Sequence, residues 1–406
     1  MSHEIGAGEL AKDQIKIPPG HFLSRVPLIG LGVGLAAAVL AYATAGGPRE
    51  FAFSWLLAVL FCLSLALGGM WFVLIHYATQ AGWGIVVRRL GENVMATMPL
   101  FALLFAPILL LMGDVFPWIH EQAEGHNAVL AGKAAFLNTS FFVARAVIYF
   151  VVWSAIALFF ARASRRQDTT RDAATSVTLK RLAGPAIIVL ALTQTFASID
   201  WVMSLSPEWY STMFGVYWFA GCFVSFFAFL TLLVMGLKRW GLMTDVVGVE
   251  HYHDLGKMIF AFTVFWAYIG FSQYFLIWYG NIPEETVFFR NRLIGAWSGV
   301  SMLLAVGHFI VPFFFLMPRT VKRNAKLLTA GAAWILFMHL VDVFWLIMPT
   351  VRPIVTRVHL IHLSDFFAVI AVAALFKGLL FRLLSGAPLV PVGDPRLPES
   401  LSFENM

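Results

Sequence analysis

Charged residues are scarce in this sequence. Only 12% of its 406 residues are Asp, Glu, Lys or Arg, whereas 60% are hydrophobic, including 39 Phe and 14 Trp. A soluble domain carries about 25% charged residues and needs polar side chains to cover its core. The composition therefore excludes a soluble globular domain and a disordered chain, and it predicts a membrane protein.

Cysteine is nearly absent as well. The two cysteines, Cys62 and Cys222, both lie in apolar runs, and the chain has no CxxCH motif for haem attachment. An iron–sulfur cluster takes about four thiolates, and covalent haem needs paired cysteines before a His. Any electron-carrying cofactor must therefore be bound non-covalently or belong to another protein.

Long apolar runs take up most of the chain. A membrane-spanning helix needs about 20 mostly apolar residues, whereas barrel strands would alternate apolar and polar residues. We predict an all-α integral membrane domain over residues 24–384, between an N-terminal tail (1–23) and a Pro-rich, extended C-terminal tail (385–406). The ten expected spans are 24–44, 52–76, 94–113, 137–160, 182–204, 212–237, 255–279, 291–316, 327–347 and 361–384.

Basic residues indicate the orientation of these spans. Most of the 28 Lys and Arg residues lie in the segments that share one side of the membrane with both termini. Because cytoplasmic loops collect Lys and Arg, both termini are expected in the cytoplasm. The same bias explains the net charge of +6. We expect no nucleic-acid partner, because the chain has no basic stripe with interleaved aromatic residues.

Two cytoplasmic segments carry mixed or polar residues. The segment 77–93 mixes apolar and basic side chains, which predicts that it lies along the cytoplasmic interface. Glu250, His251 and His253 precede the seventh span and are expected in a solvated loop.

The fifth and ninth spans end in a similar way. Asp200 precedes Pro207 by seven residues, and Asp342 precedes Pro349 by the same spacing. The two spans are four helices apart and so run in the same direction. This pattern predicts an internal repeat of two four-helix bundles, formed by spans two to five and six to nine and flanked by spans one and ten.

Ionisable residues inside spans are candidates for function, because each costs about 2.5–3.5 kcal/mol on insertion scales. A proton route needs groups such as His, or buried carboxylates, that exchange protons near neutral pH. We predict an outer half-channel and a cytoplasmic half-channel, with hydroxyl and amide side chains bridging the gaps through water. The outer group is Arg145, Asp200, His339, Asp342, His362 and Asp365, the cytoplasmic group is His76, Asp254, Lys257 and His308, and the bridging group is Ser204, Thr263, Ser272, Gln273, Tyr274 and Ser301.

Structural roles compete with this interpretation. Arg145 could serve only as an ion-pair partner of Asp200 or Asp342. His76 lies at the end of a span, where it could contact lipid headgroups. His362 and Asp365 would be interfacial residues if the tenth helix begins later than expected.

Four strings resemble a known family. They are AGWGIVVRR (81–89), FASIDWVMSLSPEWYSTMFGVY (196–217), FSQYFLIWYGNIPEET (271–286) and GHFIVPFF (307–314). They are similar to the ActF-type membrane subunits of bacterial alternative complex III, a quinol:electron-acceptor oxidoreductase. These subunits belong to the NrfD-like, polysulfide-reductase membrane family. The likeness covers about residues 22 to 384.

The resemblance implies a non-catalytic subunit of a complex in the bacterial cytoplasmic membrane. It implies two four-helix bundles, no cofactor in this chain, and a role in proton conduction. The c-type haems and iron–sulfur clusters would belong to partner subunits (ActA, ActB, ActC, ActD and ActE), and ActC is the one usually assigned the quinol or menaquinol site. Electrons would pass to a cytochrome c type protein or a terminal oxidase.

Two other functions stay open at this point. An NrfD-like subunit can bind quinol directly and take part in redox chemistry. A stand-alone secondary transporter also has internal repeats and charged residues at mid-membrane depth. Bound quinone in this chain would favour the first alternative, and purification without haem-bearing partners would favour the second.

Overall fold

The computed structural model describes residues 12–124, 128–353 and 360–405, and in these ranges every regular element is a helix. Within these ranges, ten helices are long and apolar enough to cross a membrane, which confirms the prediction of an all-α integral membrane fold. The spans are formed by η1 (Phe22–Arg25) with α2 (Val26–Ala43), α3 (Pro48–Thr79), α4 (Ile85–Met95) with α5 (Met98–Leu110), α9 (Thr139–Thr170), α10 (Ala173–Trp201) with η2 (Met203–Leu205), α11 (Phe214–Arg239), α12 (Val249–Gly280), α14 (Ala296–Leu303) with η3 (Leu304–Ile310) and α15 (Val311–Leu316), α17 (Ala325–Ile347) with η4 (Met348–Thr350), and α18 (Leu363–Ser385).

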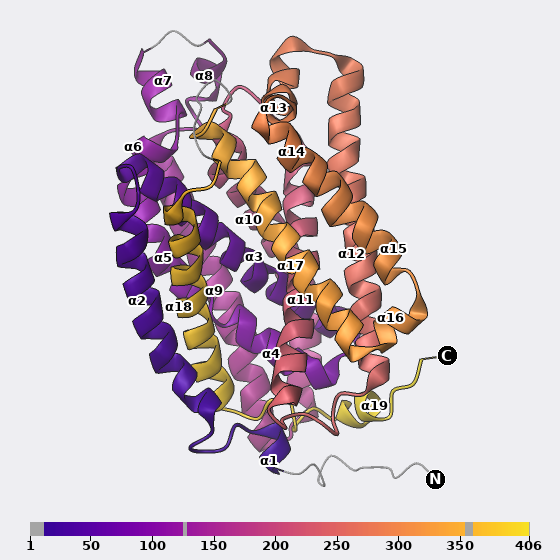
Figure 1. Ribbon diagram of the computed structural model, residues 1–406. Coiled ribbons are helices and arrows are strands. Elements are labelled where there is room, and N and C mark those ends of the chain that lie inside the picture. Colours follow the sequence, from indigo (N-terminus) through magenta and orange to yellow (C-terminus); the bar gives the residue numbers. More distant parts are fainter. Residues whose placement is uncertain (1–11, 125–127, 354–359, 406) are drawn as a thin grey trace.

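Short helices connect the spans at the two ends of the molecule (Figure 1). One end carries α6 (Met112–Val115), α7 (Trp118–Glu124), α8 (Ala128–Lys133) and α13 (Pro283–Leu293). We call it the α13 end. The opposite end, which we call the α19 end, carries α1 (Lys12–Ile15), α16 (Arg319–Arg323) and α19 (Leu397–Leu401).

Side-chain caps fix where several long helices begin. The side chains of Asn138, Asp172 and Asn324 accept hydrogen bonds from backbone N–H groups in the first turns of α9, α10 and α17. These caps satisfy donors that have no partner within the helix. A proline interrupts the helix of the third span. Pro99 has no backbone N–H to donate to a carbonyl of the preceding turn, so the span is divided into α4 and α5.

The spans pack as two groups of four around a shared centre. In the first group α3 packs against α4, α5 and α10, and α9 packs against α5 and α10. In the second group α11 packs against α12 and α17, and α12 also contacts η3 and α15. The helices α3 and α11 are the most buried spans and join the two groups.

A glycine permits the close approach of these two central helices. A Cβ built on Gly68 would lie 2.3 Å from the backbone oxygen of Cys222, so no larger residue fits at this crossing. The flanking helices α2 and α18 meet in the same way, with Gly30 against the backbone of Ala374 and Gly378. Small residues at such crossings are typical of membrane helices, which associate by close packing.

The C-terminal segment is packed against the α19 end. Leu389, Val390 and Leu397 are fully buried, and the Pro-rich stretch 386–398 forms turns that lead into α19. The backbone N–H of Leu389 donates to the oxygen of Ile15 at 2.6 Å. This segment differs from the extended tail expected from its prolines, because it buries apolar side chains against the bundle.

The structure corrects two sequence predictions at this end. Within the segment 77–93, residues 78–83 are exposed or half-buried, whereas all of α4 is buried in the protein and forms the first half of the third span. Glu250, His251 and His253 lie in the first turns of α12, with both histidines buried, and not in a solvated loop. The α4 charges, Glu250 and His251 bind other parts of the chain, which replaces their contacts with water.

Candidate functional site

Asp342 lies at the centre of the second bundle. Its side chain is 2% exposed. The hydroxyl of Tyr217 on α11 donates to one carboxylate oxygen, and the indole Nε1 of Trp266 on α12 donates to the other at 3.1 Å. Among the described residues no Lys, Arg or His forms an ion pair with Asp342. Its carboxylate is therefore held by neutral donors.

His308 packs next to this carboxylate through Trp266. The two rings stack with centroids 3.9 Å apart. His308 is fully buried, and neither ring nitrogen has a hydrogen-bond partner within the described chain. It lies in η3, a π-helical segment, where the indole of Trp334 donates to the Gly307 carbonyl at 2.6 Å. Such segments occur often at functional sites.

His339 lies one turn before Asp342 on α17, and both side chains face Gly221. A Cβ on Gly221 would lie 3.1 Å from His339 Cε1 and 3.8 Å from an Asp342 oxygen. His339 Nε2 is 2.8 Å from the hydroxyl of Ser64, which also lies 2.6 Å from the Phe61 carbonyl. The Nδ1 atom of His339 has no hydrogen-bond partner among the described residues.

An aromatic cavity of about 640 Å³ adjoins the Asp342 centre. Tyr217 and Trp266 form part of its wall and also donate to Asp342. Three of the expected water-bridging residues, Gln273, Tyr274 and Ser301, line the same space. Trp209 and Phe288 form part of the wall toward the α13 end, with their ring centroids 3.8 Å apart. The remaining wall is almost entirely apolar.

Asp200 has a different environment from Asp342. Its two carboxylate oxygens accept from Nε and Nη2 of Arg145, each at 2.8 Å, and Tyr149 donates to one of them. Arg145 also donates to the Phe136 carbonyl and lies over the Phe136 ring at 3.9 Å. This bidentate pair ties α9 to α10. The structure thus assigns Arg145 to Asp200, one of the two partners considered from the sequence.

Asp365 is also paired with an arginine. Arg352 donates to both of its oxygens and to Glu50, and Ser54 on α3 donates to Asp365 at 2.6 Å. Although burial opposes its charge, the carboxylates of Asp365 and Glu50 raise the pKa of Arg352, so this guanidinium stays charged. His362 caps α18, and its Nδ1 lies 3.1 Å from Glu50. These contacts anchor the start of α18 to α3.

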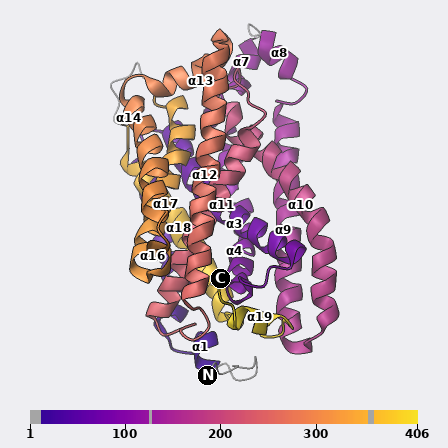
Figure 2. The same cartoon turned by 90° about the vertical axis from the view of Figure 1, so that its right-hand side faces the viewer.

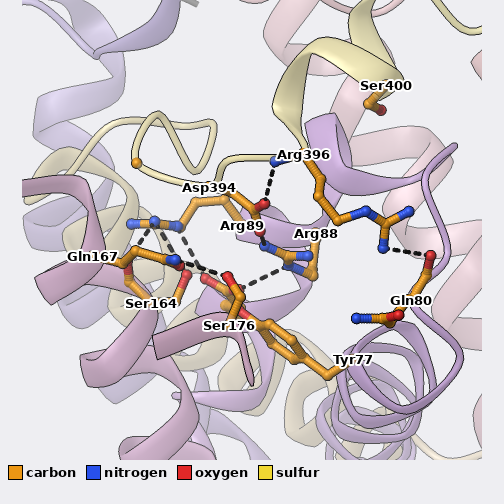
Figure 3. A network of polar contacts seen from close by, with 12 residues as sticks. Tyr77, Gln80, Arg88, Arg89, Ser164, Gln167, Ser176, Asp394, Arg396 and Ser400 are labelled. Carbon is orange, nitrogen blue, oxygen red and sulfur yellow. Dashed lines mark hydrogen bonds and ion pairs between the residues drawn. The ribbon is translucent and has the colours of Figure 1, made fainter. Parts of the chain in front are cut away.

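A second buried polar network lies on α4, at the α19 end (Figure 3). Glu92 accepts from Arg88, one turn earlier, and forms an ion pair with Arg89 at 3.0 Å. Arg89 also pairs with Asp168 on α9 at 2.8 Å, and Arg88 pairs with Asp394 of the C-terminal segment. Each of these five charged residues has a partner of opposite sign in the network, so none of them is buried without a counter-charge.

The expected cytoplasmic group does not come together as one site. His76 is buried beside Phe72 and Trp83, and its Nε2 faces Gly84, where a Cβ would lie only 2.2 Å away. Asp254 and Lys257 form an ion pair at the start of α12, and Lys257 also donates to Asn405. The fourth member, His308, belongs with Asp342 instead.

The outer group is divided into three centres. His339 and Asp342 share one centre, Arg145 and Asp200 form a second, and His362 and Asp365 belong to the third, around Arg352. Sequence reasoning missed the donors Tyr217, Trp266, Tyr149 and Arg352. It also missed the α4 network, although the spacing of Arg88, Arg89 and Glu92 places them on neighbouring turns of one helix.

The fold and these centres define a multi-pass helical membrane protein with buried ion pairs and one buried carboxylate, Asp342, that is held by neutral donors. No group of His, Cys, Asp and Glu side chains suited to a metal ion occurs among the described residues. Comparison with protein-family models found no matching family, and comparison with curated proteins found no match.

Proposed function

We propose that this chain is the cofactor-free membrane subunit of a quinol:electron-acceptor oxidoreductase and that it conducts protons. The observation that carries the proposal is the Asp342 centre. A fully buried carboxylate held only by Tyr217 and Trp266 can gain or lose a proton without breaking an ion pair. Two histidines, His308 and His339, lie beside it with unpartnered ring nitrogens, and they are suitable donors and acceptors for that proton.

The proposed complex supplies what the chain itself lacks. Quinol oxidation and electron transfer would take place in partner subunits that carry c-type haems and iron–sulfur clusters. Affinity purification through this chain should therefore recover haem absorbance and quinol oxidation activity together. A pure, haem-free preparation that still transports a solute would support the secondary-transporter alternative.

Replacing Asp342 by Asn tests the proton route directly. Asp342→Asn keeps the shape of the side chain and removes its titratable proton. We expect an assembled complex with unchanged haem content and continued quinol oxidation, while proton translocation into vesicles falls close to background. Asp342→Glu, which keeps a titratable carboxyl group, is the matched control and should retain part of the translocation.

Two outcomes would contradict this role. Loss of assembly in Asp342→Asn, but not in Asp342→Glu, would make the carboxylate a structural group. Normal assembly together with normal proton movement would remove Asp342 from the route altogether. The route would then have to pass through other residues of the bundle.

One observation favours direct quinol binding as the second candidate. The cavity of about 640 Å³ beside Tyr217 and Trp266 has aromatic walls and a few polar groups, as small-molecule sites usually do. Ala267→Phe would fill part of this space. A loss of quinol oxidation in that variant, with the haem content intact, would favour the redox role over simple proton conduction.

A further inference from the structure

A groove between α9 and α10 combines basic and apolar walls. It encloses about 610 Å³. Figure 2 shows the two helices side by side at one edge of the molecule, and they contact each other directly. Arg162 and Arg166 line the groove near the α19 end, and Leu158, Phe159 and Leu179 continue it along the spans.

Neither arginine is paired with a carboxylate within the described part of the chain. Both are exposed, and neither forms an ion pair or a side-chain hydrogen bond there. They are four residues apart on α9, so the like charges lie on one helix face, which is unfavourable without an anion. Asp172 also lines the groove and caps the start of α10, where its carboxylate accepts from Ala174 N and from the Thr175 hydroxyl. Its single negative charge leaves the groove with a net positive charge from the two arginines.

We propose that this groove binds an anionic phospholipid. Arg162 and Arg166 hold the phosphate, because guanidinium groups bind phosphate oxygens in a bidentate way. Phe159, which is 47% exposed, and Leu158 contact an acyl chain. The position agrees with a basic pocket between membrane helices on the cytoplasmic side, where anionic lipids collect. This inference is independent of whether the chain conducts protons.

A lipid is favoured over free phosphate because the apolar wall continues directly from the arginines. The other arginine of this stretch, Arg165, faces elsewhere: it donates to Asn93 and to the Leu383 carbonyl. Arg162 and Arg166 are therefore the members of the stretch that stay available to a ligand.

The test measures lipid retention by the purified protein in its complex. Samples are reconstituted with phosphatidylglycerol or with phosphatidylcholine, and the bound lipids are counted by native mass spectrometry. We expect selective retention of phosphatidylglycerol, and the double variant Arg162→Gln/Arg166→Gln should lose about one such lipid per chain. The control Arg319→Gln/Lys326→Gln removes two exposed charges from the second bundle and should lose none.

A second variant separates a lipid from its headgroup alone. Phe159→Ser removes the apolar contact and keeps both arginines. It should weaken phosphatidylglycerol retention while inorganic phosphate has no effect on either protein. Equal stabilisation by inorganic phosphate, or unchanged lipid counts in the arginine variant, would overturn the proposal. Loss of a partner subunit from the arginine variant, with lipid retained, would identify the groove as a protein interface instead.

Discussion

Three buried aspartates near the α13 end differ in what holds their charge. Asp200 and Asp365 each accept from an arginine, whereas Asp342 accepts only from a phenol and an indole. An arginine keeps its proton at all ordinary pH values, so a carboxylate paired with it is stabilised in the ionised form. Neutral donors impose no such constraint. The contrast therefore separates two structural aspartates from one suited to proton exchange.

Replacing Asp200 should destabilise the protein much more than removing one of its hydrogen bonds. Asp200→Asn leaves the Arg145 guanidinium buried without a carboxylate, which costs about 3–5 kcal/mol. Tyr149→Phe removes a single donor to the same carboxylate and should cost about 1 kcal/mol. Thermal unfolding of the purified complex, with expression level as a second readout, checks both values. If the two variants unfold alike, the ion pair does not hold α9 to α10.

The sequence predicted the importance of these residues better than their roles. The shared spacing of Asp200 and Asp342 before a proline correctly indicated buried carboxylates at similar positions of two helices. It could not reveal their partners, because Arg145, Tyr217 and Trp266 come from other helices and reach the carboxylates only after the bundle has formed. His308 was placed with the cytoplasmic group for the same reason: position along a span does not show which ring it stacks against.

The crossing of α3 and α11 leaves no room for a side chain larger than that of glycine at Gly68. Gly68→Ala would place a Cβ 2.3 Å from the Cys222 carbonyl, and backbone atoms cannot move aside as a flexible side chain could. We expect a loss of about 1–3 kcal/mol, the usual cost of overpacking. The matched control is Gly184→Ala, a helical glycine with nothing within 4 Å of its Cβ. It should unfold at the same temperature as the parent or slightly higher.

The unfolding temperatures of the two glycine variants show whether the close approach of α3 and α11 at Gly68 contributes to stability. A Gly68→Ala protein as stable as Gly184→Ala would mean that α3 and α11 separate at little cost. The two bundles would then be joined mainly elsewhere.

Hydropathy predicts helices well and buried charge badly. All ten spans were expected from their apolar length alone, because lipid requires about 20 apolar residues whatever the helix contacts. For the third span, the predicted first residue was wrong: the span was expected to begin at residue 94, but its helix begins at Ile85. Arg88, Arg89 and Glu92 suggested an interface, yet α4 is buried because Asp168 and Asp394 neutralise the arginines. Those partners lie far away in the sequence, so no local pattern could have indicated them.

At the scale of the whole molecule, the C-terminal segment connects both bundles. Asp394 pairs with Arg88 and the hydroxyl of Ser400 donates to the Trp83 carbonyl, which binds the segment to the first bundle. His251 on α12 contacts the Ser400 carbonyl at 2.9 Å, and Asn405 accepts from Lys257. The segment thus closes the α19 end across the two groups of helices.

A substitution at Gly393 tests whether the C-terminal segment is held against the first bundle by its close contact with α9. A Cβ on Gly393 would lie 2.0 Å from the Gln167 carbonyl, whereas on Gly386 the nearest atom is 3.6 Å away. Gly393→Ala should displace the segment from α9, so that protease added to the detergent-solubilised protein cleaves the segment faster than in the parent. Gly386→Ala should behave like the parent. Equal protection of both variants would show that the segment is held without the Gly393 contact.

The orientation of the whole bundle can be measured independently of its function. Basic residues gather in the segments that share a side with both termini, and because cytoplasmic loops retain Lys and Arg, we predict that this side faces the cytoplasm. Both α1 and α19 lie at one end of the bundle (Figure 1), as ten spans require. Reporter fusions after Arg166 and Lys322 should therefore give a cytoplasmic signal, and fusions after Glu124 and Glu285 an external one. An external signal after Arg166 would reverse the orientation, and it would also remove Arg162 and Arg166 from the leaflet where anionic lipids are most abundant.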